Sequence, residues 1–338
     1  MYGGMIMRLG INGLTHDHVD GSMAVKGIIG ELYRMAGKDF PFASAEEWRV
    51  FMCDSRVSIP ERFDTITSVL QTNDALDLLG YAYGAHRARE GYMYVEGKFA
   101  PQYHTREWLT MRGATAAIIK GLRRAEDETG IRIFPVVCIG REATPETGVE
   151  IARIALGYGG EVGLDLVCDE AGNPPEKHLP AYASTFGSNV RRDCHVGEWV
   201  EAEPAATYLQ RLRKNIWTAV TELKCHGIGH AIPLGGNEEL MNVIAGEGVR
   251  VSGCPLSNKT LGWVKDLREL CIDQVLDRGI CYTLNPDDDL FLPTMEETVR
   301  ECDRVYAFSP AHRKALQENV FKGAFDPRMR DNWRKFVK

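Results

Sequence analysis

The chain has 338 residues, of which 44% are hydrophobic, an ordinary globular composition with enough length for one large core or two smaller ones. Forty basic against 47 acidic residues give a formal net charge of −7, and no Lys/Arg run is long enough to follow a phosphate backbone, so a nucleic acid is not an expected partner. No apolar stretch reaches the roughly 18 residues of a membrane span and no secretory leader is recognisable, so we expect a cytoplasmic protein without a membrane partner.

Short apolar runs alternate with stretches of helical spacing along the chain, a pattern typical of parallel β/α architecture. One run contains Pro135, which cannot donate a hydrogen bond within a central strand. The pattern predicts eight strands, over Leu9–Leu14, Tyr92–Phe99, Ile131–Ile139, Val162–Val167, Asn189–Cys194, Gly227–Ala231, Val249–Gly253 and Ile280–Leu284.

The helices between these runs carry clearer signals. Thr144 and Pro145 open one helix, residues 206–223 repeat apolar side chains every three or four positions, and Asn237 opens another. Eight such units predict an α/β fold, a single (β/α)8 TIM barrel over residues 1–338, with residues 22–90 inserted after the first strand as a helical lid. An open doubly wound sheet remains an alternative, although no G-x-G-x-x-G follows a strand.

Polar residues gather where the predicted strands end, and in a barrel those ends meet at one mouth. The first strand runs into His16 and His18, whose side chains share one side of an extended backbone. Later strands end at His195, His230 and the acidic run that begins at Asp287. Catalytic zinc takes imidazole and carboxylate ligands, so His16, His18, His195 and Asp287 form a predicted metal shell.

Other polar residues have plainer interpretations. Asp289 fits a solvated turn, and Cys194, although next to His195, would point to the opposite side of its strand. The nine cysteines show no C-x-x-C spacing, which favours reduced thiols, and no G-x-S-x-G marks a serine nucleophile. We expect five further histidines to be surface or capping residues: His86, His104, His178, His226 and His312.

Taken in order, these motifs resemble the adenosine deaminase family of the amidohydrolase barrels. The resemblance covers nearly the whole chain. Six motifs carry it: His16–Ser22 for H-x-H-x-D-G-S, Gly163–Glu170 for G-x-D-L-x-G-D-E, His195–Glu198 for H-A-G-E, Gly229–Ala231 for G-H-G, Cys254–Asn258 for C-P-x-S-N, and Asn285–Asp288 for N-T-D-D.

The resemblance implies a role for each site residue. One zinc ion per chain, held by the shell above, would activate a water molecule for attack on C6 of a purine. His230 would orient that water, Asp287 would accept its proton, and Glu198 would protonate N1 of the ring. Asp288 would hydrogen-bond N7, while Gly197 and the backbone near Cys168 would meet the other edge of the purine.

The acid at position 20 bears on the substrate. Family members with Asp there contact a ribose hydroxyl, which favours a purine nucleoside as the small-molecule partner, so Asp20 is a predicted substrate ligand. Three departures affect this assignment: Cys168 replaces a glycine, Lys98 stands where arginine is usual, and Pro286 and Asp289 flank the aspartate pair.

We therefore expect a zinc-dependent hydrolase of cyclic amidine C–N bonds that converts adenosine, or a close 6-aminopurine nucleoside, to the 6-oxo product and ammonia. Deamination of a modified adenine compound or another aminated heterocycle is an alternative, and a non-catalytic barrel that binds purine or a protein partner is a remote one. The oligomeric state is left open by the sequence.

Overall fold

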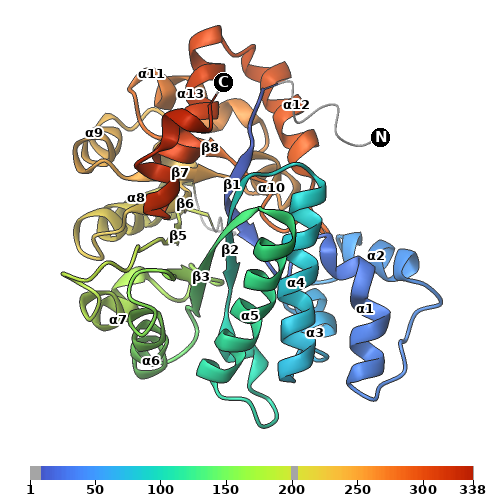
Figure 1. Cartoon of the computed structure of the whole chain (residues 1–338). Helices are drawn as coiled ribbons and strands as arrows, with labels where there is room; N and C mark the ends of the chain where they lie inside the picture. Colours follow the sequence, from blue (N-terminus) through green and yellow to red (C-terminus); the bar gives the residue numbers. More distant parts are fainter. Residues whose placement is uncertain (1–8, 199–204, 338) are drawn as a thin grey trace.

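The computed structural model describes residues 9–198 and 205–337. Its strands are all parallel to their neighbours and lie at the centre of the molecule, surrounded by helices (Figure 1). The strands are β1 (Gly13–His18), β2 (Tyr94–Phe99), β3 (Arg132–Gly140), β4 (Gly163–Val167), β5 (His195–Val196), β6 (Gly227–His230), β7 (Arg250–Gly253) and β8 (Tyr282–Leu284).

Two four-stranded sheets make up this centre, in the orders β1-β2-β3-β4 and β5-β6-β7-β8. Single bridges join their edges, one between Leu164 and Arg192 and the other between Asp17 and Asp287. At the second edge the side chain of Asn285 also accepts hydrogen bonds from the backbone N–H groups of Thr15 (2.8 Å) and His16 (3.0 Å). The arrangement fits a TIM barrel in which a side chain completes the ladder between the first and last strands.

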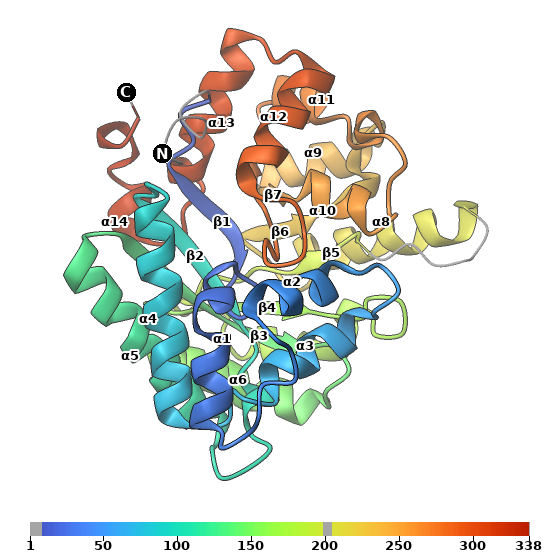
Figure 2. The same cartoon turned by 90° about the vertical axis from the view of Figure 1, so that its right-hand side faces the viewer.

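Helices surround the strands, and their order follows the expected β/α alternation. The helix α4 packs between α5 and α1, while α1, α2 and α3 lie together on one side (Figures 1 and 2). The helices are α1 (Ala24–Met35), α2 (Ala45–Cys53), α3 (Ile59–Thr67), α4 (Asn73–Arg89), α5 (Met111–Thr129), α6 (Pro145–Leu156), α7 (Leu179–Ala183), α8 (Ala205–Thr221), α9 (Glu238–Glu247), α10 (Pro255–Thr260), α11 (Ile272–Asp277), α12 (Met295–Tyr306), α13 (Pro310–Lys322) and α14 (Pro327–Arg330).

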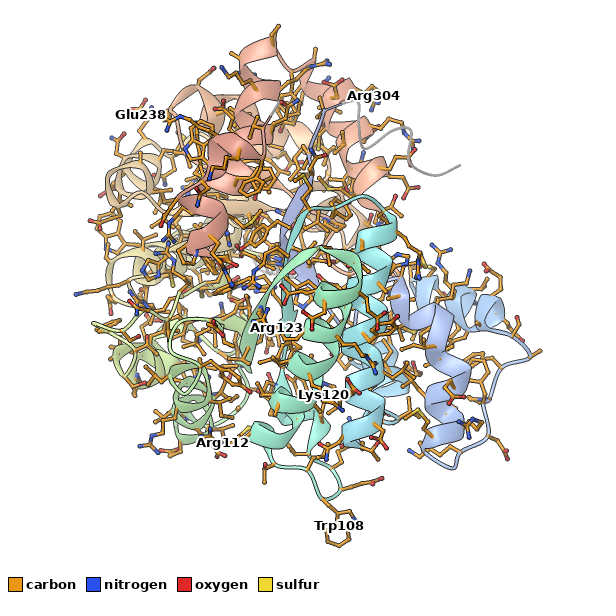
Figure 3. The ribbon with its side chains drawn as sticks, in the orientation of Figure 1. Trp108, Arg112, Lys120, Arg123, Glu238 and Arg304 are labelled. Carbon is orange, nitrogen blue, oxygen red and sulfur yellow. The ribbon has the colours of Figure 1, made fainter. Side chains whose placement is uncertain are left out.

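Short 3-10 helices occur at η2 (Pro101–His104), η3 (Pro175–His178), η4 (Ile232–Leu234), η5 (Leu267–Leu270) and η6 (Trp333–Lys335). Labelled charged side chains such as Lys120 and Glu238 lie on the outside, and Trp108, 95% exposed, projects from the loop before α5 (Figure 3). Among the described helices, none combines the length and the apolar character needed to cross a membrane.

The sequence between β1 and β2 is helical, as expected for residues 22–90. Its contacts reach the segment after β8: Leu290 donates its backbone N–H to Gly21, and the Phe63 and Phe291 rings meet edge to face at 5.7 Å. The insertion therefore packs against the loop that follows the last strand. Its movement as a lid stays a prediction.

Six predicted strands differ from the structure by only one or two residues at an end, whereas the first and the fifth differ more. The first begins at Gly13 rather than Leu9, and His16 and His18 belong to it rather than following it. The fifth is only His195–Val196, because residues 189–194 contribute one bridge and isolated backbone hydrogen bonds. Polar side chains at the strand ends hid both boundaries, since His and Asp are uncommon in strands.

Three other expectations are confirmed. The Thr144 hydroxyl caps α6 by accepting the N–H of Thr147, and the Asn237 side chain caps α9 by accepting that of Leu240. Pro135 lies within the unbroken β3 and pairs in register with Gly97.

The barrel interior is charged rather than filled only with aliphatic layers. The Lys98 ammonium lies 2.5 Å from Asp165 and 2.8 Å from Asp193, and Arg250 joins Asp193 (3.2 Å) to Glu96 (2.8 Å). All five side chains are buried. Burial opposes the charge on Lys98, but the two aspartates raise the pKa of Lys98 above its ordinary value. We call these five residues the axial charge network.

A second buried ion cluster, outside the barrel, joins the first strand to the segment that follows the last strand. Arg87 of α4 contacts Asp17 of β1 and Asp289 after β8, each at 2.7 Å, and Tyr83 donates its hydroxyl to Asp17 at 2.6 Å. Asp289 is only 2% exposed. Its interpretation as a solvated turn residue is therefore wrong, because a helix far away in the sequence supplies the compensating cation.

Replacing Arg87 with Met should destabilise the fold by about 3–5 kcal/mol, because Asp17 and Asp289 would stay buried without their cation. Urea denaturation measures the change. The matched control is Arg89→Met on the same helix, where the side chain is exposed and the expected loss is under about 0.5 kcal/mol. Equal stability of the two variants would show that Arg87 does not stabilise the fold through Asp17 and Asp289.

His226, just before β6, makes the stability of the protein depend on pH. Its Nδ1 accepts the backbone N–H of Arg192 at 3.0 Å, which requires that nitrogen to be unprotonated. Burial and the neighbouring Arg191 and Arg192 charges lower the pKa of His226 from 6.5 to about 3. His226 is thus half-buried, and its ring is held neutral as a hydrogen-bond acceptor.

Acid should therefore destabilise the protein partly through His226. Between pH 6.5 and 3 the unfolded chain takes up a proton at this residue that the folded chain does not, so stability falls as the pH falls through that window. His226→Asn keeps an acceptor but cannot titrate, and its unfolding free energy should decline less steeply. Identical pH slopes, from denaturation curves at each pH, would refute the assignment.

Candidate active site

Three strands, β1, β5 and β8, bring the predicted metal ligands to one point at the carboxyl mouth of the barrel. The Asp287 Oδ1 atom lies 3.5 Å from His16 Nε2 and 3.3 Å from His18 Nε2, and His18 Nε2 lies 3.1 Å from His195 Nε2. His230 joins this cluster, since ligand atoms of His16, His195, His230 and Asp287 all lie within 4.8 Å of one another.

The chemistry of these groups fits a metal ion. Within residues 9–198 and 205–337, neither ring nitrogen of the fully buried His16 makes a hydrogen bond. Burial, with nearby positive charge, lowers the pKa of His16 and of His195 well below the ordinary value, so both rings are neutral and have a lone pair to offer. Three imidazoles and a carboxylate form a ligand set that zinc accepts.

His18 behaves differently because acids surround it. Burial alone would lower the pKa of His18, but Asp288, Asp287 and Asp20 together raise it to about 10. These acids favour positive charge at this point, whether a proton on His18 or a metal ion carries it. The local charge balance is thus a second reason to place a cation here.

Residues outside the cluster orient the predicted ligands. The Asp165 carboxylate of the axial charge network contacts His195 Nδ1 at 3.0 Å, and Ser257 donates its hydroxyl to Asp287 Oδ2 at 2.7 Å. Asn258 Oδ1 lies 2.9 Å from His230 Nδ1. Such partners fix ring orientation and tautomer in metal sites. These residues lie within the sequence motifs, but the spacing of the motifs did not predict that they orient the metal ligands.

Glu198 lies beside His230, with 3.6 Å between Glu198 Oε2 and His230 Nε2. Burial, together with Asp287 and Glu170 and against the opposing effect of His230, raises the pKa of Glu198 to about 7. The turn that carries it is held by Glu170, which accepts the backbone N–H groups of Gly197 (2.9 Å) and Glu198 (2.8 Å). A carboxyl group poised near neutrality can donate a proton.

Glycines make room for two of these side chains. A Cβ at Gly229 would lie 2.6 Å from His16 Cε1, and one at Gly21 would overlap Asp288 Oδ1 at 1.6 Å. Three site residues that are not glycine hold positive φ angles: Cys168 (76°), His230 (60°) and Asp287 (69°). Strained backbone of this kind gathers at functional sites, where the surrounding structure stabilises it.

The predicted purine contacts surround the cluster. Asp20 and Asp288 are buried beside His18, and burial and neighbouring acids raise the pKa of Asp288 well above its ordinary value. The Cys168 thiol lies 3.3 Å from the Tyr103 hydroxyl. The Gly197 N–H donates to Glu170 in this structure, and its contact with a substrate stays a prediction.

The remaining histidines lie outside the cluster, but two of them are not surface residues. His104 and His178 are fully buried and contact backbone carbonyls of Leu70 (3.1 Å) and Arg141 (3.0 Å). The expectation of a surface or capping role is therefore wrong for these two. Histidine is intermediate between the apolar and charged residues in its tendency to be buried, so composition could not settle their location.

A parallel barrel with a buried His/Asp cluster that could hold a metal ion at its carboxyl mouth fits the amidohydrolase class. Comparison with known proteins narrows this class. The profile of the family described as Adenosine deaminase matches residues 13–333, and the chain belongs to this family. It is accordingly a hydrolase of C–N bonds, and the non-catalytic alternative is not retained.

Curated relatives agree on purine deamination but differ in substrate. The chain is 28% identical to an adenine deaminase of Ralstonia pickettii, over 92% of this chain and 89% of that protein. It is also 28% identical to an adenosine deaminase of Enterococcus faecalis, over 78% of this chain and 76% of the relative. Hydrolytic deamination of a purine is the activity these relatives support.

Solved structures share the fold. An adenine deaminase from Arthrobacter aurescens superposes with a TM-score of 0.79 at 22% identity, covering 96% of this chain and 98% of that one. An amidohydrolase from Burkholderia ambifaria with bound zinc superposes with a TM-score of 0.81 at 21% identity, covering 98% and 90%. At these identities the likeness concerns the barrel alone.

Removing one ligand should abolish metal binding. We expect the wild-type chain, dialysed against excess zinc and then washed, to retain about one ion and gain thermal stability from it, whereas His195→Ala should retain little and gain none. Metal analysis and melting curves measure both effects. His86→Ala, a half-buried histidine of α4 outside the cluster, is the matched control, and a loss of zinc there equal to that of His195→Ala would contradict the assignment.

Proposed function

We propose that this chain is a deaminase of adenosine or a closely related 6-aminopurine nucleoside, with one zinc ion held by His16, His18, His195 and Asp287. The observation that carries the proposal is Glu198, a buried carboxyl group with a raised pKa that adjoins both His230 and the ligand cluster. A proton donor beside a metal-activated water is what attack on an aminopurine requires.

Each of these side chains performs one task in the reaction. When bound, zinc supplies the Lewis acidity that makes water nucleophilic near neutral pH. Glu198 gives a proton to N1, which makes C6 electrophilic, and His230 orients the attacking water. Asp287 accepts the proton that the water loses. The C6–oxygen bond forms, Asp287 passes its proton to the amino group, and the C6–nitrogen bond breaks with release of ammonia. The C6 hydroxyl proton returns to Glu198 as the 6-oxo group forms.

The purine is held by residues around the cluster. Asp288, whose pKa is raised, would donate a hydrogen bond to N7, and the chain near Cys168 and Gly197 would line the opposite edge. Asp20 would accept a hydroxyl of the sugar. Gly21 supports this arrangement because only a residue without Cβ leaves room for the Asp288 carboxylate.

Free adenine is a second candidate substrate, since relatives at 28% identity carry the name adenine deaminase. Modified adenine compounds remain a third, because the Cys168 side chain occupies space that a glycine would leave open. Ammonia release from a panel of adenosine, adenine and N6-substituted adenines, measured with the zinc-loaded protein, ranks the three. Absence of turnover on every 6-aminopurine would refute the proposed function.

Glu198→Gln should abolish turnover while leaving zinc bound, because N1 loses its proton donor and the ligands stay in place. We expect kcat to fall by at least about 10²-fold, with metal content unchanged. Glu161→Gln, an exposed residue before β4 at the opposite end of the barrel, serves as the control. Substantial activity in Glu198→Gln would show that another group protonates the ring.

A further inference from the structure

A cavity of about 580 Å³ lies at the end of the barrel opposite to the histidine cluster. Its wall includes residues that precede strands, namely Glu161 before β4, Arg191 before β5 and His226 before β6, and residues 325–330 of the C-terminal segment. Parallel strands begin at one end of a barrel and finish at the other, so this cavity is separate from the candidate active site. Its volume is typical of a small-molecule site. We call it the basal cavity.

Arg191 lines the basal cavity without an acidic partner. Within residues 9–198 and 205–337 its guanidinium takes part in no ion pair, and its buried Nε atom makes no hydrogen bond. The side chain does contact the Phe325 ring, whose centre lies 5.4 Å from Arg191 Cζ. Glu96 favours the charge on Arg191, but both Glu96 oxygens already accept hydrogen bonds from Arg250 at 2.8 Å. The positive charge of Arg191 is therefore left uncompensated.

Other positive charges surround Arg191. Burial and the charges of Arg330, Arg250 and Arg192 lower the pKa of Arg191 to about 10, which still leaves it protonated at neutral pH. The charges of Arg191, Arg192 and Arg330 also lower the pKa of His226. Two groups of the cavity wall thus respond to the same excess of positive potential, and a bound anion would relieve it.

The acidic residues of the wall do not compensate Arg191. Asp326 is fully buried and already contacts Arg132 and Arg328, the latter at 3.0 Å. Glu161 is exposed and forms no ion pair within the described part of the chain. The compensating negative charge therefore has to come from a ligand or from solvent ions.

Phosphate is the anion that this arrangement favours. Its two negative charges suit several guanidinium groups at once, and each guanidinium can donate two parallel hydrogen bonds to it. Arg328 and Arg330 line the same cavity as Arg191. Arg328 is exposed, so the cavity opens to solvent, and Arg330 has the exposed Asp331 as its acidic partner at 3.2 Å. A carboxylate carries a single charge and would leave part of the positive potential uncompensated.

We propose that the basal cavity binds a phosphate group, with Arg191 as its principal ligand and Arg328 and Arg330 beside it. The phosphate is either inorganic phosphate or part of a small phosphate monoester, since the cavity has room for an organic group. This site goes beyond the proposed function and does not depend on it. The Phe325 ring contacts Arg191 and also Arg250 of the axial charge network, at 4.2 Å from Arg250 Cζ. The ligand would therefore add negative charge next to that network.

Calorimetric titration of the zinc-loaded protein with inorganic phosphate and with ribose 5-phosphate tests the site. Arg191→Gln removes the charge, and Arg112→Gln, at an exposed arginine of α5, is the control with the same change of charge. We expect Arg112→Gln to match the wild-type affinity for each ligand and Arg191→Gln to bind at least about tenfold more weakly, as for the loss of charge-assisted hydrogen bonds. His195→Ala should bind phosphate as the wild type does, because the metal cluster lies at the other end of the barrel.

Melting curves separate ligand binding from a structural role of Arg191. Without phosphate, Arg191→Gln should melt at or above the wild-type temperature, because it relieves repulsion from Arg192, Arg250 and Arg330. Phosphate should then raise the melting temperature of the wild type and leave that of Arg191→Gln unchanged. A variant that melts below the wild type and gains as much from phosphate would show that Arg191 is structural, and the inference would be wrong.

The two ligands identify the source of the phosphate. Tighter binding of ribose 5-phosphate would assign the site to a monoester, and equal or weaker binding would assign it to inorganic phosphate; both results support the inference. It is overturned if the wild type binds neither ligand up to millimolar concentrations, if acetate binds as tightly, or if Arg191→Gln keeps the wild-type affinity. Ammonia release from 6-aminopurines tests the proposed function separately, so either proposal can fail without the other.

Discussion

The axial charge network is the constraint on which the rest of the structure depends. Lys98, Asp165, Asp193, Arg250 and Glu96 lie inside the barrel where water cannot compensate an unpaired charge, so each needs its neighbours. The Asp165 carboxylate has two partners: it pairs with Lys98 and contacts the ring of His195. The orientation of a predicted metal ligand is thereby tied to ion pairs that extend toward the opposite end of the barrel.

This arrangement explains why lysine can stand at position 98. A guanidinium would suit planar, two-pronged pairing, whereas a compact ammonium fits between the carboxylates of Asp165 in β4 and Asp193 just before β5. Lysine in place of the arginine of the family pattern therefore keeps the positive charge but changes the geometry of the ion pairs. The strained φ angles of His230 and Asp287 are held by similar means, since Asn258 and Ser257 fasten their side chains.

Much of the site could be predicted from the sequence because its chemistry is concentrated at strand ends. His16, His18, His195, His230 and Asp287 were recognisable as a set, and the structure brings them together. The sequence pattern could not predict contacts between residues far apart in the chain. Examples are the contact of Arg87 with Asp289 and that of Asn285 with the backbone of β1. The strand bounds failed at β1 and β5 for the related reason that functional polar residues interrupt the apolar signal.

The cluster draws on both the first and the last strand, with His16 and His18 near one end of the chain and Asp287 some 270 positions later. A ribosome-bound chain that lacks its final strand can therefore offer imidazoles but not the carboxylate, and it also lacks Asn285 to complete the ring of strands. The complete ligand set exists only once the segment that carries Asn285 and Asp287 has been synthesised and has closed on the first strand. Assembly of the predicted metal shell therefore has to follow closure of the barrel, and the folding of the first β/α units alone cannot produce it.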